Sequence, residues 1–195
     1  MIAIVDYGAG NISSVKKAFE HLGAQIEVTS DAKVIVAADK IAVPGVGHFN
    51  RCAALNEILK APIMEAIARG VPFLGICVGM QWLFLGSTES PETPGAGLFY
   101  SQCSRFPASV KSPHVGWNQI DVIPDSRLLR NVPDHAFVYF THSYRAPVIG
   151  GTTASAEYGG AFSAAVERDN IFGVQFHPEK SGAAGLTILE NFCAL

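Results

Sequence analysis

The chain has few cysteines, and none of them is placed for a metal site or a disulfide framework. Its 195 residues include four, Cys52, Cys77, Cys103 and Cys193, which are widely separated in the sequence. There is no C-x-x-C pair, and no histidine stands at metal-ligand spacing from any of the four. We therefore expect no metal and no cofactor.

Basic residues and long apolar runs are also scarce. The chain has 14 Lys and Arg residues, a formal net charge of −3 and no basic run, which argues against nucleic acid as a partner. No apolar run approaches the roughly 18 residues of a membrane span, and no basic leader region precedes the first apolar segment. The hydrophobic fraction of 49% suffices for one core. We expect a single domain, residues 1–195, in the reducing cytoplasm, with a small molecule or another protein as its partner.

In the first half of the chain, short apolar strands alternate with helical patterns. Strands are predicted at 2–5, 26–28 and 41–43, and a fourth begins at Val71. This alternation indicates an α/β fold with a central, mostly parallel sheet flanked by helices, in which ligands bind beyond the carboxyl ends of the strands. The helices expected between these strands run from a cap at Asn11 or Ser13 to Leu22, over 49–59 and from Pro62 to Arg69, while the short apolar run at 33–38 fits either type.

The second half has a different pattern. After a polar loop at 86–97, short strand-like segments are separated by turn signals, which predicts an antiparallel extension of the sheet. A terminal helix is expected to start near Ser181 and to include Phe192. The predicted strands are 117–123, 136–140, 152–156, 162–166 and 171–176.

A cysteine stands at the junction of a predicted strand and a predicted helix. The segment Gly75-Ile-Cys77-Val-Gly79 follows the apolar strand and leads directly into an apolar helix. A nucleophile at such an elbow needs a strained backbone and small neighbours, and the two glycines meet that need. The helix N-terminus favours a thiolate at Cys77. From this spacing alone, a buried structural thiol is the alternative.

A thiolate at this elbow needs a base from elsewhere in the chain. Ionising an ordinary cysteine at neutral pH takes about 2 to 3 kcal/mol, whereas a helix terminus supplies about 0.3 to 1 kcal/mol. Among six histidines, His177 has the best context, because it follows the apolar strand 171–176 and precedes Pro178 and Glu179. Pro178 favours an extended segment, in which Glu179 binds one imidazole nitrogen and leaves the other for Cys77. The alternative is a structural histidine with a solvated glutamate.

Two motifs taken together resemble those of a known family. The segments 75–81, with the sequence Gly-Ile-Cys-Val-Gly-Met-Gln, and 173–180, Gly-Val-Gln-Phe-His-Pro-Glu-Lys, are similar to the signature motifs of the class I, or triad, glutamine amidotransferases. The resemblance covers essentially the whole chain and implies the single-domain fold of that family. The motifs at 44–47, 113–118 and 139–144 narrow it to the glutaminase subunits of imidazole glycerol phosphate synthases, which serve histidine biosynthesis.

The resemblance implies a role for each matching residue. Cys77 would attack the side-chain amide of glutamine, His177 would act as base and then as acid toward the departing ammonia, and Glu179 would orient His177. The amides of Val46 and Val78 would hold the oxyanion, and water would hydrolyse the thioester to glutamate. The residues implied in glutamine binding are Gly47, Gln81, Glu89, His142, Ser143 and Tyr144.

The resemblance also implies a partner. The chain has no P-loop, no G-x-G-x-x-G motif and no length left for an acceptor domain, so we expect the ammonia acceptor on another polypeptide. In this branch of the family the acceptor is a (β/α)8-barrel cyclase, which forms a heterodimer with the glutaminase. The cyclase converts a phosphorylated ribulosyl intermediate into imidazole glycerol phosphate and an aminoimidazole carboxamide ribotide. The matching interface positions are Asn11, Trp117, Tyr139 and Lys180.

One regulatory hypothesis and several alternatives accompany this interpretation. Glycines on both sides of Val46 make a peptide flip sterically cheap, so its amide is hypothesised to turn toward the oxyanion only when the partner binds its substrate. The alternatives are a cysteine hydrolase or peptidase without a partner, a non-catalytic binding module, and glutaminase subunits for anthranilate, carbamoyl phosphate or pyridoxal phosphate synthesis. The motif at 113–118 is what separates this last group from the imidazole glycerol phosphate branch.

Overall fold

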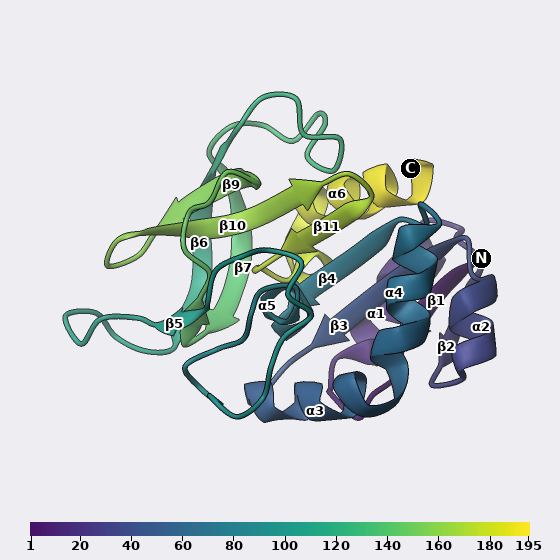
Figure 1. The fold of residues 1–195 in the computed structure, drawn as a ribbon. Coiled ribbons are helices and arrows are strands. Elements are labelled where there is room, and N and C mark those ends of the chain that lie inside the picture. Colours follow the sequence, from purple (N-terminus) through teal and green to yellow (C-terminus); the bar gives the residue numbers. More distant parts are fainter.

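A nine-stranded sheet forms the centre of the computed structural model, which describes residues 1–195 (Figure 1). The strands are β1 (Ile2–Val5), β2 (Ile26–Thr29), β3 (Lys40–Gly45), β4 (Phe73–Cys77), β5 (Ser104–Arg105), β6 (His114–Val122), β7 (Ala136–His142), β8 (Tyr144–Arg145), β9 (Thr152–Glu157), β10 (Ala161–Arg168) and β11 (Ile171–Val174). The order in the sheet is β2-β1-β3-β4-β11-β10-β9-β6-β7, and β5 and β8 form a separate pair. From β2 to β11 neighbouring strands are parallel, and beyond β11 they are antiparallel. The predicted α/β fold with an antiparallel extension is confirmed.

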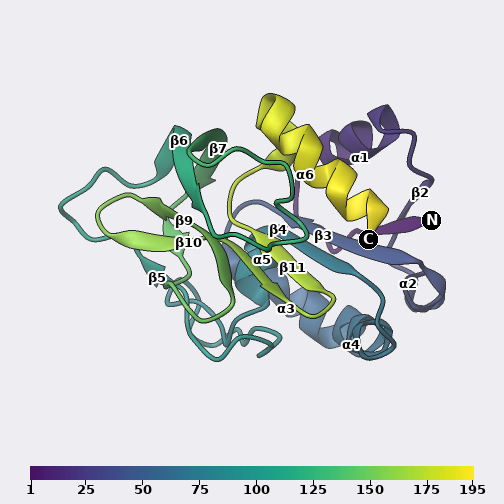
Figure 2. The same cartoon turned by 90° about the horizontal axis from the view of Figure 1, so that it is seen from above.

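Helices cover both faces of the parallel half. They are α1 (Ile12–His21), α2 (Ala32–Ala37), η1 (Phe49–Arg51), α3 (Cys52–Ala54), η2 (Leu55–Leu59), α4 (Lys60–Ala68), α5 (Val78–Trp82), η3 (Pro178–Lys180) and α6 (Gly182–Ala194). Figure 2 shows α1 and α6 on one face of the sheet and α3 and α4 on the other. All 52 buried apolar side chains belong to one cluster, so both halves share a core. None of the helices combines the length and the apolar character needed to cross a membrane.

The prediction that one helix ends at Leu59 and a second begins at Pro62 is wrong. Helical structure is continuous from η1 through α4, and Pro62 is a buried residue inside the first turn of α4. A proline lacks the amide hydrogen that an α-helix needs and crowds the preceding turn. Here the wider π-helical turn of η2 lies directly before α4, and such turns are one way in which a helix absorbs a local irregularity. The undecided run at 33–38 is helix α2, capped by the Asp31 side chain, which accepts a hydrogen bond from the Lys33 amide.

The paired strands β6 and β7 have apolar residues on both faces. His114, Ile120 and the β7 residues Val138 and Phe140 are buried. On the opposite face, Trp117 pairs with Tyr139 across the two strands. The exposed fractions on that face are 57% for Val115, 56% for Trp117 and 56% for Phe137. We call this exposed apolar face of β6 and β7, made of Val115, Trp117, Phe137 and Tyr139, the aromatic face.

Candidate active site

The carboxyl ends of three neighbouring strands meet at one place in the sheet. Cys77 is the last residue of β4 and pairs in register with Gly45, the last residue of β3. On the other side of β4, Val174 of β11 pairs with Ile76, so the residues after β11 continue past the cysteine. Because these strands are parallel, segments far apart in the sequence contribute to one edge, as ligand sites in α/β sheets do.

The elbow at Cys77 has the strained backbone that the sequence predicts. The φ and ψ angles of Cys77 are 55° and −108°, a region that non-glycine residues rarely adopt. A Cβ atom on Gly79 would lie 1.9 Å from the Val43 carbonyl oxygen, and one on Gly75 would lie 2.5 Å from the Gly79 carbonyl oxygen. Helix α5 therefore packs against β3 and β4 too closely for any side chain at either glycine.

His177 and Glu179 form a buried pair. Nδ1 of His177 lies 2.8 Å from Oε1 of Glu179, and the exposed fractions of the two side chains are 1% and 0%. Nε2 of the same imidazole has no hydrogen-bond partner. Burial disfavours the charged imidazolium, but the nearby Cys77 sulfur and the Glu179 carboxylate outweigh burial and raise the pKa of His177 to about 10. The Cys77 sulfur thus affects the charge of the ring without completing a hydrogen bond to Nε2.

The backbone between these two residues differs from the extended segment that was expected. His177 itself is extended, with φ −102° and ψ 94°, but Pro178 starts the 3-10 turn η3. Proline restricts the residue that precedes it, whereas its own φ suits the first position of a helical turn. The turn still leaves the Glu179 carboxylate within hydrogen-bond distance of the imidazole.

Asn11 is turned toward this pair. It occupies the N-cap position of α1 with a left-handed backbone, φ 77°, but its side chain makes no capping hydrogen bond. Of the two expected cap positions, Asn11 and Ser13, the structure has Asn11 at the N-cap, but without the side-chain hydrogen bond that usually stabilises a helix start. Its Nδ2 donates instead to Oε1 of Glu179 and lies 3.4 Å from Nδ1 of His177. A carboxylate is a strong acceptor for the amide hydrogen, and the contact fixes Glu179.

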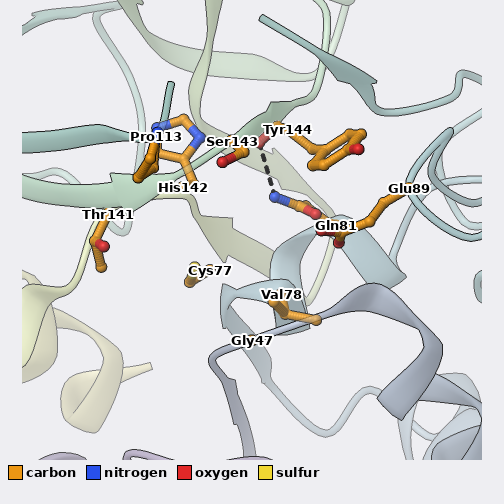
Figure 3. Close-up of a pocket in the computed structure, with 10 residues that line it drawn as sticks. All are labelled: Gly47, Cys77, Val78, Gln81, Glu89, Pro113, Thr141, His142, Ser143 and Tyr144. Atoms are coloured by element: carbon orange, nitrogen blue, oxygen red, sulfur yellow. Dashed lines mark hydrogen bonds between the residues drawn. The ribbon is translucent and has the colours of Figure 1, made fainter. Parts of the chain in front are cut away.

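A cavity of about 280 Å³ opens beside the cysteine (Figure 3). It lies between the elbow of β4 and α5 and the segment that joins β7 to β8. All six residues expected to bind glutamine line it, together with Cys77 and Val78, whereas Val46, His177 and Glu179 do not. Two lining residues, Pro113 and Thr141, were missing from the expected set. The lining residues are Gly47, Cys77, Val78, Gln81, Glu89, Pro113, Thr141, His142, Ser143 and Tyr144.

Two polar side chains on the elbow side of the cavity are held in place. Nε2 of Gln81 donates to the Tyr144 carbonyl oxygen at 2.9 Å, the bond drawn in Figure 3. Oε2 of Glu89 accepts a hydrogen bond from the Phe49 amide at 2.8 Å. The turn after β3 is half-buried at Val46 and exposed at Gly47, where φ is +100°. A left-handed backbone at Gly47 is accessible because glycine has no Cβ.

Two histidines on the other side of the cavity form a second buried pair. Nδ1 of His114 lies 3.3 Å from Nε2 of His142, and Nδ1 of His142 lies 2.9 Å from the Tyr144 carbonyl oxygen. Burial lowers the pKa of His142 to about 3 and that of His114 to about 4. Both rings are neutral at pH 7, so the cavity wall that His142 forms carries no charge.

The expected interface residues other than Asn11 lie together. The ring centroids of Trp117 and Tyr139 are 6.1 Å apart, and the Lys180 ammonium lies 5.9 Å from the centroid of the Tyr139 ring. Sequence reasoning missed Val115 and Phe137 of the same aromatic face. The signal was present, because β6 and β7 carry apolar residues at both odd and even positions, which indicates strands covered on both faces.

Comparisons with known proteins agree with this geometry. Residues 3–195 match the family described as "Glutamine amidotransferase class-I". The chain is 47% identical to the imidazole glycerol phosphate synthase subunit HisH of Methanothermobacter thermautotrophicus, over 98% of this chain and 97% of that protein. It is 45% identical to the HisH subunit of Salinibacter ruber, over 100% and 94% of the two chains.

Solved structures share the fold. A crystal structure described as a glutamine amidotransferase superposes with a TM-score of 0.77 at 17% identity, over 99% of this chain and 100% of that chain. The PurLQS structure from Thermotoga maritima gives a TM-score of 0.74 at 18% identity, over 99% and 97% of the two chains. At such identities the likeness shows the fold alone.

Proposed function

The chain belongs to the class I glutamine amidotransferase family, and from that premise we propose that it is the glutaminase subunit of an imidazole glycerol phosphate synthase. Residues 1–195 act as one glutaminase domain in the cytoplasm. The subunit hydrolyses glutamine to glutamate and ammonia and passes the ammonia to a (β/α)8-barrel cyclase subunit. Similarity to several HisH subunits over almost the full length of both chains supports this assignment.

One observation carries the chemical part of the proposal. A cysteine on a strained strand-to-helix elbow opens into a polar cavity of about 280 Å³. A buried histidine and glutamate pair lies close enough for the Cys77 sulfur to raise the pKa of His177. A nucleophile, a base and a group that orients the base are the components of covalent acyl transfer.

The reaction starts with His177 charged. Because its pKa is about 10, the ring is an imidazolium at neutral pH, and Cys77 reacts as the thiolate. The thiolate attacks the side-chain carbonyl carbon of glutamine, and the amides of Val46 and Val78 stabilise the oxyanion. His177 then gives its proton to the departing nitrogen, ammonia leaves, and a γ-glutamyl thioester is formed. Glu179 holds the imidazole in position and stabilises its charged form.

Hydrolysis of the thioester completes the cycle. Neutral His177 removes a proton from water, which attacks the thioester carbonyl and expels the Cys77 thiolate. The products are glutamate and the restored ion pair. Glutamine itself is bound by the six cavity residues that the sequence implies, and the Glu89 carboxylate suits its ammonium group.

The aromatic face is the proposed docking site for the cyclase. Large exposed apolar patches mark interaction sites, and tryptophan and tyrosine are frequent anchors. This face is joined to the catalytic histidine through the backbone, because the Tyr139 carbonyl oxygen accepts a hydrogen bond from the His177 amide at 2.9 Å. Lys180 and Asn11 complete the proposed interface. A partner that binds Trp117 and Tyr139 can therefore shift the position of His177. In this proposal the partner also controls the flip of the Val46 amide toward the oxyanion.

The test is glutamine hydrolysis by the chain alone, with the cyclase, and with the cyclase and its ligand. The proposal expects glutamate formation that requires Cys77 and rises with each addition. A C77A variant that retains the activity would contradict the assignment of the nucleophile. Equal rates in all three mixtures would rule out the Val46 switch, and absence of imidazole glycerol phosphate synthesis from glutamine would exclude the proposed partner.

A further inference from the structure

The residue directly after β11, Gln175, is a buried amide that contacts the catalytic sulfur. Its exposed fraction is 0%. Val174 pairs with Ile76 across the parallel strands, so the next residue along β11 lies beside Cys77. Nε2 of Gln175 is 3.6 Å from Sγ of Cys77, within hydrogen-bond distance for sulfur. The proposed reaction does not use this side chain.

A backbone carbonyl fixes which end of Gln175 faces the sulfur. The Tyr144 carbonyl oxygen can only accept, so the Gln81 atom that lies 2.9 Å from it is the amide nitrogen. The same nitrogen lies 3.0 Å from Gln175, whose facing atom must therefore be its carbonyl oxygen. The remaining atom of the Gln175 amide, its NH2 group, is thereby directed at Cys77. The reversed amide would place two donors against each other.

The same carbonyl fixes the orientation of groups on the other side of the cavity. Nδ1 of His142 donates its hydrogen to the Tyr144 carbonyl, so Nε2 of that ring is an acceptor. His114 donates to it through Nδ1 and presents its own Nε2 to the Asn118 amide at 3.5 Å. One carbonyl thus sets the direction of a continuous series of hydrogen bonds that ends at the nucleophile.

We propose that Gln175 is a positioning residue, which holds the Cys77 thiolate with an N–H donor and ties it to the glutamine-binding side chain Gln81. A thiolate accepts hydrogen bonds and donates none, so a donor facing the sulfur favours its ionised form. The amide of Gln175 is the donor that lies within hydrogen-bond distance of the sulfur. Because Cys77 lines the cavity, this bond helps to hold the sulfur there. The inference rests on the proposed function only in that Cys77 is the nucleophile.

Because both hydrogens of the Gln81 amide are used by Tyr144 and Gln175, only its carbonyl oxygen is free for a ligand. The Gln175 contact therefore also determines that Gln81 offers an acceptor to glutamine. This second effect of Gln175 is on binding, so it should appear in KM, whereas the contact with sulfur should appear in the reactivity of the thiol.

The test is the rate at which iodoacetamide alkylates Cys77, followed by mass spectrometry of the Cys77 peptide from about pH 6 to about pH 10. In Q175M both hydrogen bonds are lost, whereas Q175E keeps an acceptor for Gln81 and loses the donor. Both variants should be alkylated about tenfold more slowly than the wild type at neutral pH, a typical effect of one hydrogen bond to a charged group. The difference should disappear at high pH, where the thiol is ionised in every variant. In the cyclase complex, Q175M should also raise KM for glutamine, and Q175E should raise it less.

Asn191 provides a matched control. Its buried amide nitrogen donates to the carbonyl oxygens of Leu128 and Arg130 at 2.9 and 2.7 Å, away from the cavity. N191L loses two hydrogen bonds, as Q175M does, and should be alkylated at the wild-type rate at each pH. The proposal is overturned if Q175M and Q175E also react at the wild-type rate, or if all three variants slow equally at every pH, which is the mark of a structural effect. Alkylation does not need glutamine turnover, so this result is independent of whether the wild-type chain proves to be a glutaminase.

Discussion

The parallel and antiparallel halves of the molecule each place histidines near the same cavity, but the histidine of the parallel half is charged and those of the antiparallel half are neutral. His177, at the end of the parallel half, is fully buried and has its pKa raised to about 10 by Cys77 and Glu179. His142 and His114, in the antiparallel half, are also buried, yet their pKa values fall to about 3 and about 4. Burial penalises the charged ring in both places. The presence of acidic neighbours decides which histidine is charged.

The surroundings of the neutral pair explain the contrast. The His114 ring stacks between those of Phe140 and Tyr158, with centroid distances of 4.9 and 4.1 Å. His142 donates to a carbonyl and accepts from His114, an arrangement that uses both nitrogens of a neutral ring. A proton on Nε2 of His142 would point at the Nδ1 hydrogen of His114. In the proposed mechanism, proton transfer therefore belongs to the parallel half, and binding by uncharged groups belongs to the antiparallel half.

The largest difference is expected when equivalent substitutions are made in the two halves. H177N should lower kcat for glutamine about 10,000-fold, as expected for loss of a proton-transfer group in a triad. H142N should act chiefly on KM, raising it about tenfold by loss of a binding group. Steady-state kinetics of both variants in the cyclase complex measures the split. Comparable losses of kcat in the two variants would remove the distinction between the halves.

The next largest effect concerns the close packing of α5 against β3 in the parallel half. G79A should lower the free energy of unfolding by about 3 kcal/mol or more, because the added Cβ would lie 1.9 Å from the Val43 carbonyl oxygen. A Cβ on Gly150 would meet no atom within 4 Å, and the backbone there is not left-handed, so G150A is the matched control and should be nearly neutral. Urea unfolding followed by circular dichroism compares them. A stable G79A variant would refute the close approach of α5 and β3.

The free energy of unfolding should depend on the antiparallel half at acid pH and on the parallel half at alkaline pH. His114 and His142 have lowered pKa values, so their contribution is present above about pH 6.5 and is lost as the pH falls toward 4, by up to about 1.4 kcal/mol per pH unit for each. The contribution of His177, whose pKa is raised, is present below about pH 6.5 and is lost as the pH rises toward 10. H114F should reduce the slope of the acid limb, and H177N should reduce that of the alkaline limb. Urea unfolding at a series of pH values tests this, and slopes that do not change in the variants would contradict these protonation states.

The smallest expected effect is on docking through the antiparallel half. W117A and F137A should each weaken binding of the cyclase about 30-fold, as exposed aromatic anchors commonly do, without changing the alkylation rate of Cys77. I58A removes an apolar side chain that is 68% exposed in η2, outside the aromatic face, and should bind normally. Isothermal titration of the cyclase distinguishes these cases. Equal affinities for all three variants would place the docking site elsewhere.

The sequence predicts the strands and the elbow of the parallel half, because the signals for them are local. It predicts the finer details of that half less well. Apolar runs and glycine spacing around Cys77 specify the strand, the elbow and the helix within a few residues of one another. The continuous helix through Pro62 was not predicted, because no local sequence signal specifies the π-helical turn that precedes α4. The inward turn of Asn11 depends on Glu179, which is distant in the sequence.

The site residues that the sequence did not predict also depend on contacts between distant parts of the chain. Gln175 interrupts the apolar run 171–176, and a polar residue inside a buried strand is a signal that it needs partners, but the sequence does not identify them. The His114 and His142 pair requires the register of β6 with β7, in which these two residues face each other. Strand pairing is a long-range property, so the neutral half of the site was less accessible to sequence reasoning than the charged half.

Capture of the acyl intermediate tests most directly whether Cys77 is the nucleophile. The complex with the cyclase is mixed with glutamine, quenched in acid and digested, and the peptide that contains Cys77 is analysed by mass spectrometry. A γ-glutamyl adduct is expected on Cys77 of the wild type and should be absent from C77A. Glutamine turnover in C77A, or an adduct on a different residue, would contradict it.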